Sequence, residues 1–404
     1  MPEPASSPLR RREFRLYFAG NLASNIGNWL ANVALAIFMH DLTHSSFWVG
    51  LALFGLNTPV LFFGLKAGVL ADRLDRVRLL IVSQVVMGTL ATALTVLVAI
   101  GHAGRYNVTL ISFGMGIGVA LSIPAMQALI PVLVPHEELA DAIRLNALTF
   151  NSARIFGPAI AAITLKTLGA SWAFGLNALS FVPLLWALRA IGTPPFPRAA
   201  DRPPGPISEG IAYAWTHLRT RSMLLAIVAI SIALDPITTL SPALATRFGL
   251  RSNGAGWIVT AWGCGGVLVI VGARKLIIAA TRHGTGWAGL LALAAGMVLL
   301  GATRSPVIGL TGGALAGVGY ILATMVFTTV IQSEVPESLR GRVSAIWTLA
   351  FLGPRAVVSV LDGFLGDRFG AGRTTIAFGL VALVAAAFLR RVETSAAEPV
   401  PPPA

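Results

Sequence analysis

Three ionisable residues stand near the middle of long apolar stretches, where a charge needs a protein or water partner. Asp235 is the only acid near the middle of a stretch, and Arg154 and Arg355 lie near the middle of two others. A buried carboxylate that loses a cationic neighbour can bind a proton and release it when the neighbour returns. We predict proton coupling by Asp235, with Arg154 or Arg355 as its changeable partner; a permanent ion pair is the alternative. Asp362, two turns beyond Arg355, is expected to be solvated.

A stripe of amides follows helical spacing. Asn21, Asn25, Asn28 and Asn32 fall at i, i+4, i+7 and i+11, so they share one helix face. The same spacing recurs later in Ser231, Asp235, Thr238 and Pro242. Because four amides facing lipid would be costly, we expect the stripe to line a polar cavity, with helix–helix hydrogen bonding as the alternative.

Aromatic rings complete the candidate cavity, which suits an amphipathic or aromatic solute. The predicted cavity residues are Asn21, Asn25, Asn28, Asn32, Trp29, Phe150, Ser231, Thr238, Trp262, Thr324, Thr328 and Trp347. Packing and interfacial anchoring are common roles of membrane aromatics, and they are the alternative for these rings.

Thiol, metal and hydrolytic chemistry have little support in the sequence. Cys264 is the single cysteine, which excludes an intrachain disulfide and makes a thiolate cluster implausible. The histidines show no metal-ligand spacing, and no nucleophile–base set lies near the middle of the apolar stretches. We therefore expect no enzyme, no cofactor and no metal site.

Twelve apolar stretches must position these residues. A hydrocarbon core of about 30 Å needs about 20 helical residues per crossing, and the chain is 55% hydrophobic and 12% charged. Continuous apolar runs indicate helices rather than a barrel, so the fold class is an all-α polytopic membrane protein. The predicted spans are 14–39, 48–71, 79–101, 107–133, 141–166, 171–191, 222–246, 254–273, 284–303, 306–331, 342–367 and 374–389.

The net charge of +13 is explained by its placement. With the N-terminus inside, the cytoplasmic connectors hold most of the Arg and Lys residues, which is the positive-inside pattern. Both termini are therefore predicted to be cytoplasmic, and no nucleic-acid partner is needed. The basic start lacks a small-residue cleavage site, so the first span is expected to be a retained anchor.

The longest internal connector divides the spans six and six. The predicted domains are a cytoplasmic tail at 1–13, a six-helix bundle at 14–191, a cytoplasmic linker at 192–221, a second six-helix bundle at 222–391 and a disordered cytoplasmic tail at 392–404. The linker begins proline-rich and then places Ile207, Ile211, Trp215 and Leu218 at helical spacing. This spacing predicts an amphipathic helix on the membrane surface.

The connector after the second span reads Gly68-Val-Leu-Ala-Asp72-Arg73 and continues with Arg76 and Arg78. It resembles the loop 2–3 signature of the major facilitator superfamily. The resemblance implies 12 transmembrane helices in two pseudo-symmetric six-helix bundles (the major facilitator fold), with a substrate site between them. It also implies a gating motif of Gly68, Asp72, Arg73 and Arg76 that latches this loop to the start of span 11; a basic cluster without a gating role is the alternative.

More of the chain resembles the exporter branch that includes enterobactin and macrolide efflux proteins. The resembling segments are 14–50, 128–135, 153–158, 335–343 and 363–370. Gly157 and Pro158 match the core of the antiporter motif of exporters, in which a proline kinks a closely packed helix. Ala161 and Ala162 replace the later glycines of that motif. The resemblance implies export rather than uptake.

We expect a secondary active transporter in the bacterial cytoplasmic (inner) membrane. It would export a small amphipathic molecule (a drug, a macrolide or a siderophore-like compound) by alternating access and proton antiport, as a monomer in the lipid bilayer. The arginine common in span 4 of drug–proton antiporters is missing from 107–133, which keeps facilitated efflux open. The alternatives are an importer or facilitator of a small metabolite or lipid, and, from another class, a non-transporting membrane scaffold.

Overall fold

The computed structural model describes residues 7–73, 75–192, 207–272 and 286–397, and within these ranges every regular element is a helix. The first helix group consists of α1 (Arg12–Thr43), α2 (Ser46–Arg73), α3 (Arg76–Ala99), α4 (Arg105–Leu133), α5 (Leu139–Thr167) and α6 (Ala170–Ile191). The second helix group consists of α8 (Leu218–Leu234), α9 (Pro236–Thr239), α10 (Ser241–Arg247), α11 (Ala255–Gly272), α13 (Gly286–Ala302), α14 (Pro306–Glu334), α15 (Glu337–Phe369) and α16 (Ala371–Ala397). Short 3₁₀ turns η1 (Pro8–Arg10), η2 (His136–Glu138) and η3 (Ser252–Gly254) precede α1, α5 and α11.

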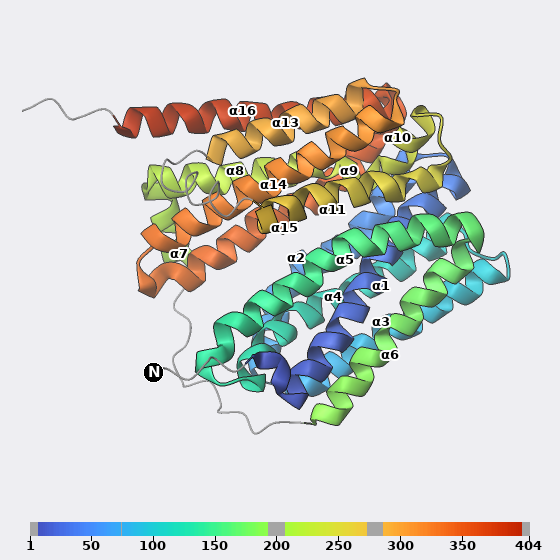
Figure 1. The fold of residues 1–404 in the computed structure, drawn as a ribbon, viewed down its shortest axis with the longest axis horizontal. Helices are drawn as coiled ribbons and strands as arrows, with labels where there is room; N and C mark the ends of the chain where they lie inside the picture. Colours follow the sequence, from blue (N-terminus) through green and yellow to red (C-terminus); the bar gives the residue numbers. More distant parts are fainter. Residues whose placement is uncertain (1–6, 74, 193–206, 273–285, 398–404) are drawn as a thin grey trace, which may run out of the picture.

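Each helix group is held by its own packing, and two helix pairs form the most extensive contacts between the groups. In the first group α1 packs on α5 and α6, and in the second α13 packs on α14 and α16. Between the groups, α2 packs on α15 and α5 packs on α11. The helices follow the long axis of the molecule, and the groups diverge toward the end that carries α7 (Ile207–Thr216) (Figure 1).

Apolar composition explains why the helices form one multi-pass membrane fold. Eleven of the described helical segments are long and apolar enough to cross a membrane. The described part of α13 has 17 residues, and residues 273–285 before it lie outside the described ranges. The all-helical membrane fold is therefore confirmed, while the count of twelve spans stays a prediction.

The predicted span at 222–246 is interrupted rather than continuous. Helix α8 ends at Leu234, Pro236 begins α9, and α10 starts at Ser241 next to Pro242. A proline supplies no backbone N–H, so the helical ladder cannot run through it unbroken. The interruption places Asp235 at a helix junction, where its carbonyl oxygen accepts a 3.1 Å hydrogen bond from the N–H of Thr239.

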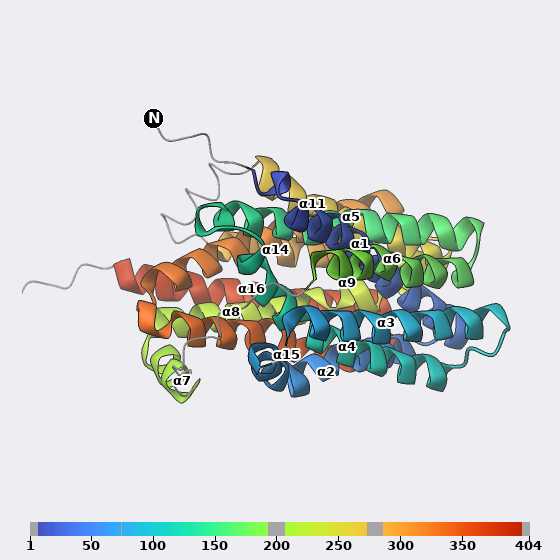
Figure 2. The same cartoon turned by 90° about the horizontal axis from the view of Figure 1, so that it is seen from below.

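The linker helix α7 is shorter than the predicted stretch, because Leu218 already belongs to α8. It docks on the start of α15, where Glu209 pairs with Arg342 and Gly210 lies against the stem of the same arginine. Ile211 and Trp215 are exposed, as expected of an apolar face turned toward a membrane surface. Figure 2 shows α7 projecting at one end of the molecule.

Candidate functional site

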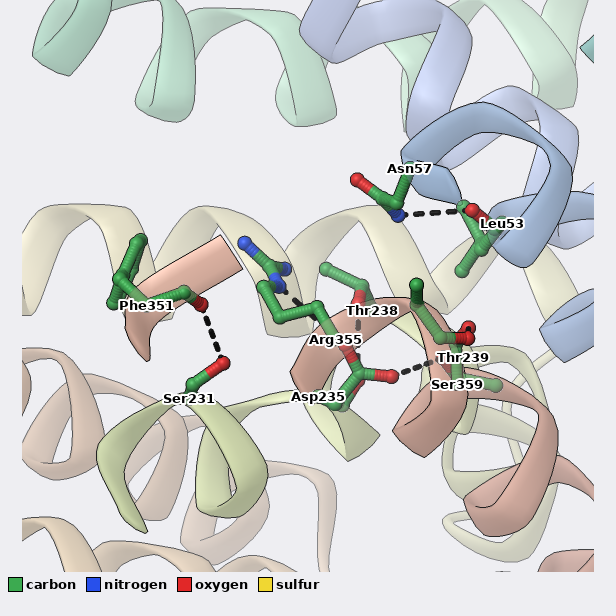
Figure 3. A network of polar contacts seen from close by, with 10 residues as sticks. Leu53, Asn57, Ser231, Asp235, Thr238, Thr239, Phe351, Arg355 and Ser359 are labelled. Carbon is green, nitrogen blue, oxygen red and sulfur yellow. Dashed lines mark hydrogen bonds and ion pairs between the residues drawn. The ribbon is translucent and has the colours of Figure 1, made fainter. Parts of the chain in front are cut away.

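Asp235 and Arg355 form a buried ion pair inside the second helix group. The Nε atom of Arg355 lies 3.4 Å from Oδ1 of Asp235, and the Thr239 hydroxyl donates a 3.1 Å hydrogen bond to Oδ2. Asp235 is 1% exposed, whereas the Arg355 side chain keeps partial access. Figure 3 shows the carboxylate between Arg355 and Thr239. Of the two arginines considered from the sequence, the structure pairs Arg355 with Asp235.

Asp362 is a second buried acid of this site, and the expectation that it is solvated is wrong. It is 0% exposed, and neither carboxyl oxygen has a hydrogen-bond partner within the described part of the chain. Its polar neighbours are Asp235, Thr239 and the backbone N–H of Gly363. The position of Asp362 near the outer end of α15 predicts solvation, but its i+7 spacing from Arg355 places both side chains on one helix face. This spacing is the sequence signal that indicates a buried position for Asp362.

Arg154 stands apart from the carboxylates, enclosed by aromatic rings. Its guanidinium carbon lies 4.7 Å from the ring centroid of Trp262, 5.2 Å from those of Phe150 and Tyr320, and 5.6 Å from that of Trp29. The side chain is buried, and Nε has no hydrogen-bond partner among the described residues. Rings around a desolvated cation stabilise it through their negative faces.

The rings continue as a row that joins Arg154 to the ion pair. Trp262 contacts Tyr320 at 5.6 Å, Tyr320 stacks on Phe351 at 6.0 Å, and Phe351 stacks on Trp347 at 5.5 Å. Phe351 precedes Arg355 by four residues on α15, so the two share a helix face. Trp29, Phe150, Trp262 and Trp347 of the predicted cavity set are thus brought together, while Tyr320 and Phe351 were missed. Helical spacing within one span could not reveal a row built from several spans.

The asparagine stripe divides into two parts. Asn21 donates a 2.9 Å hydrogen bond to Asn146, and Asn25 donates 3.2 Å bonds to Asn21 and Thr149, so these amides join α1 to α5. For this part, the geometry matches the alternative of helix–helix hydrogen bonding. Asn28 and Asn32 are half-buried, and their side chains make no hydrogen bond to another described residue.

The smaller polar residues of the cavity set lie on α8, α9 and α14. The Ser231 hydroxyl donates a 2.6 Å hydrogen bond to the Phe351 carbonyl oxygen, and Thr238 bonds the Asp235 carbonyl oxygen (Figure 3). Thr324 and Thr328 are half-buried on α14, and the Thr324 hydroxyl has no hydrogen-bond partner in the described ranges. Across those ranges, no three His, Cys, Asp or Glu residues form a group that could hold a metal ion.

Glycines let α5 approach both of its neighbours closely. A Cβ at Gly157 would lie 2.5 Å from the Cβ of Trp29 on α1. On the opposite side, a Cβ at Gly256 or Gly263 of α11 would lie 2.6 Å from the Pro158 carbonyl oxygen or 2.8 Å from that of Arg154. Helix α5, with its Gly157-Pro158 pair, is therefore packed between α1 of its own group and α11 of the other group, and this packing holds Arg154 at the boundary of the two groups.

The predicted gating motif is described only in part. The side chains of Gly68, Asp72 and Arg73 lie outside the described residues, although the backbone of α2 is helical to Arg73. Arg76 donates a 3.1 Å hydrogen bond to the Ala128 carbonyl oxygen. Asp75, which sequence analysis passed over, caps α3 by accepting hydrogen bonds from the N–H groups of residues 77 and 78.

Comparison with known proteins gives a family and a fold. The family model described as "Transmembrane secretion effector" matches residues 4–400. Enterobactin exporters of Shigella boydii and Escherichia coli are each 26% identical over 399 residues, covering 96% of this chain and 94% of the relative.

Solved structures support the same fold. A bacterial homologue of the iron transporter ferroportin, in an inward-facing state, aligns with a TM-score of 0.73 at 14% identity, covering 95% of this chain and 99% of that one. A bacterial homologue of the lysosomal transporter Spinster, inward-facing and unoccupied, gives 0.73 at 15% identity, covering 96% and 98%. At these identities the likeness concerns the fold alone.

Proposed function

Since the chain belongs to the transmembrane secretion effector family of the major facilitator superfamily, we propose that it exports a siderophore-like molecule by proton antiport across the bacterial inner membrane. The enterobactin exporters that it resembles over nearly its whole length support this direction and solute class. The observation that carries the proposal is a set of buried charged and aromatic side chains, which we call the charged seam. It consists of Arg154 at the boundary of the two helix groups, the Asp235–Arg355 pair, and the aromatic row of Trp262, Tyr320 and Phe351 between them.

Alternating access is supported by where the helix groups join. Most polar contacts between the groups occur at the ends predicted to be outside, where Ser252 donates to Asp41 at 2.9 Å and Asp367 binds the start of α2. One further contact lies within the spans, where the Thr260 hydroxyl of α11 donates to the Ile155 carbonyl oxygen of α5 at 3.4 Å. At the opposite end, the ion pairs Arg11–Glu138, Arg219–Glu334 and Arg342–Glu209 each stay within one part of the chain. This pattern fits a transporter closed outside and open to the cytoplasm, whose two groups rock to expose the seam to the other side.

The proton step is assigned to Asp235 and its neighbours. Two adjacent buried carboxyl groups repel each other when both are ionised, and Arg355 balances only one negative charge. A proton bound by Asp235 or shared with Asp362 removes the imbalance. The described part of α2 that packs on α15, Ser46–Phe63, carries no charged side chain, so it supplies no second counter-ion. Movement of Arg355 between access states would therefore change the proton occupancy of Asp235.

Reconstituted protein tests the proposal with enterobactin as the probe. A proton gradient imposed on proteoliposomes should drive enterobactin accumulation by the wild type, while Asp235→Asn should lose at least about tenfold of this proton-driven flux. Equilibrative exchange of enterobactin should survive in the variant, because binding does not need the proton. Asp141→Asn, an exposed acid paired with Arg144, is the control. Full proton-driven flux in Asp235→Asn would refute the coupling role.

A further inference from the structure

The guanidinium of Arg154 lacks an anion, although it is only 6% exposed. No ion-pair partner stands beside it in the described part of the chain, and its Nε donor is unused. Four rings surround it, and these offer negative faces but no full negative charge. A buried cation held in this way keeps much of its capacity to bind an anion.

Other buried donors near the same row of rings are also unused. The indole N–H groups of Trp262 and Trp347 and the hydroxyl of Thr324 have no hydrogen-bond partner within the described residues. Trp262 belongs to the enclosure of Arg154, Thr324 lies one helical turn from Tyr320, and Trp347 stacks on Phe351. Indole and guanidinium groups donate and do not accept, so they cannot satisfy one another. The two indole N–H groups and Nε of Arg154 therefore lack an acceptor atom, while the Thr324 hydroxyl can donate or accept.

We propose that Arg154, Trp29, Phe150, Trp262 and Tyr320 form a subsite for an aromatic group that carries carboxylate or phenolate oxygens. The ring of the solute stacks on the aromatic side chains, and its anionic oxygens accept hydrogen bonds from Arg154 and from the indole N–H of Trp262. A cationic solute is disfavoured, because the enclosure contains a fixed positive charge and no carboxylate.

The subsite takes residues from both helix groups: Trp29 and Arg154 come from α1 and α5, and Trp262 and Tyr320 come from α11 and α14. A solute bound there touches both moving parts, as an alternating-access mechanism requires. The inference rests on the proposed export function, because it names the substrate class of the same seam.

Ligand binding to the full chain in lipid nanodiscs tests the assignment without any transport. The probes are salicylate, neutral salicylamide and cationic benzylamine, followed by quenching of tryptophan fluorescence. We expect salicylate to bind the wild type at least tenfold more tightly than either other probe, and Arg154→Gln to lose at least tenfold in salicylate affinity. Arg144→Gln, an exposed arginine on the same helix, should bind like the wild type.

A further variant, Trp262→Phe, tests the subsite independently of Arg154. Trp262→Phe retains a ring but removes the unused N–H, so it should weaken salicylate binding several-fold and salicylamide binding less, because a neutral carbonyl oxygen is a weaker acceptor than a carboxylate. If Arg154→Gln does not fold, the ligand series on the wild type and on Trp262→Phe still decides. Equal binding of salicylate and salicylamide, or unchanged salicylate affinity in a folded Arg154→Gln, overturns the inference. Selective binding without any proton-driven flux would instead contradict the export proposal alone.

Discussion

The carboxylate of Asp367 accepts a 2.6 Å hydrogen bond from the backbone N–H of Ser46, which joins the end of α15 to the start of α2 across the two helix groups. The N–H of Phe47 and the hydroxyl of Ser45 bind the same carboxylate. An acid at a helix N-terminus satisfies free N–H groups and complements the positive end of the dipole. Asp367 is therefore a polar latch between the groups.

The latch has a sequence counterpart at the other end of α2. The segment Gly363-Phe-Leu-Gly-Asp367-Arg368 has the spacing of Gly68-Val-Leu-Ala-Asp72-Arg73, and the two segments end the paired helices α15 and α2. The major facilitator resemblance implies that Asp72 latches the loop after α2 to the start of α15 in one of the two access states, and we expect this to be the state opposite to the one that Asp367 closes. The two acids would then alternate, one closing each side of the membrane.

Removal of the charge at Asp367 should shift this balance. Asp367→Asn weakens the contacts with the start of α2 by about 1 kcal/mol, which is roughly a fivefold change in the ratio of the two access states. The distance between spin labels on the predicted outer ends of α2 and α11 should then show a larger population of long distances than in the wild type. Asp141→Asn serves as the control, because its carboxylate pairs within α5. An unchanged distance distribution in Asp367→Asn would exclude a latching role.

The asparagine stripe predicts a contrast between stability and transport. Asn21→Ala removes the hydrogen bonds of Asn21 with Asn146, Thr149 and Asn25 at the α1–α5 contact, which should cost about 1–3 kcal/mol and lower the melting temperature in detergent by a few degrees. Asn28→Ala removes no hydrogen bond within the described residues, so it should melt like the wild type. Because Asn28 is predicted to face the solute, enterobactin affinity should fall in Asn28→Ala and stay unchanged in Asn21→Ala. The reverse pattern would contradict both assignments.

The packing of α5 predicts a steric effect at Gly157. In Gly157→Ala the new methyl group would meet Trp29 at 2.5 Å and the Ile26 carbonyl oxygen at 2.9 Å, so α1 and α5 must move apart. We expect destabilisation by about 1–3 kcal/mol, measured as a lower thermal midpoint. Gly88→Ala, whose Cβ would lie 3.6 Å from Phe181, is the matched control and should be nearly neutral. Equal midpoints for the two variants would show that the α1–α5 contact is adaptable.

The second acid should matter as much as the first for proton coupling. Asp362→Asn keeps the side-chain volume but removes a carboxyl group beside Asp235, so proton-driven enterobactin flux should fall at least about tenfold. Ser359→Ala changes a buried polar residue on the same helix whose hydroxyl bonds only its own helix backbone, and its flux should be close to normal. Normal flux in Asp362→Asn would leave Asp235 as the sole carrier.

The buried charges separate what one segment specifies from what helix packing specifies. Apolar composition was enough to place Asp235, Arg154 and Arg355 inside membrane helices, because the cost of charge in lipid depends on position in a single segment. The choice between the two arginines could not be made, since it depends on how α5 and α15 are rotated about their axes. Asp362 is buried for the same reason: its depth along α15 predicts solvation, whereas the helix face that it shares with Arg355 turns it into the site.

Sequence alone therefore determined that this protein lies in a membrane, that it is all-helical and which superfamily it resembles, because hydropathy and local motifs are properties of single segments. Tertiary structure decided which residues meet: Asp235 with Arg355 and Asp362, Arg154 with four rings from four helices, and Asp367 with the start of α2. These contacts join residues up to about 320 positions apart. Such contacts follow from helix packing rather than from any pattern within one helix.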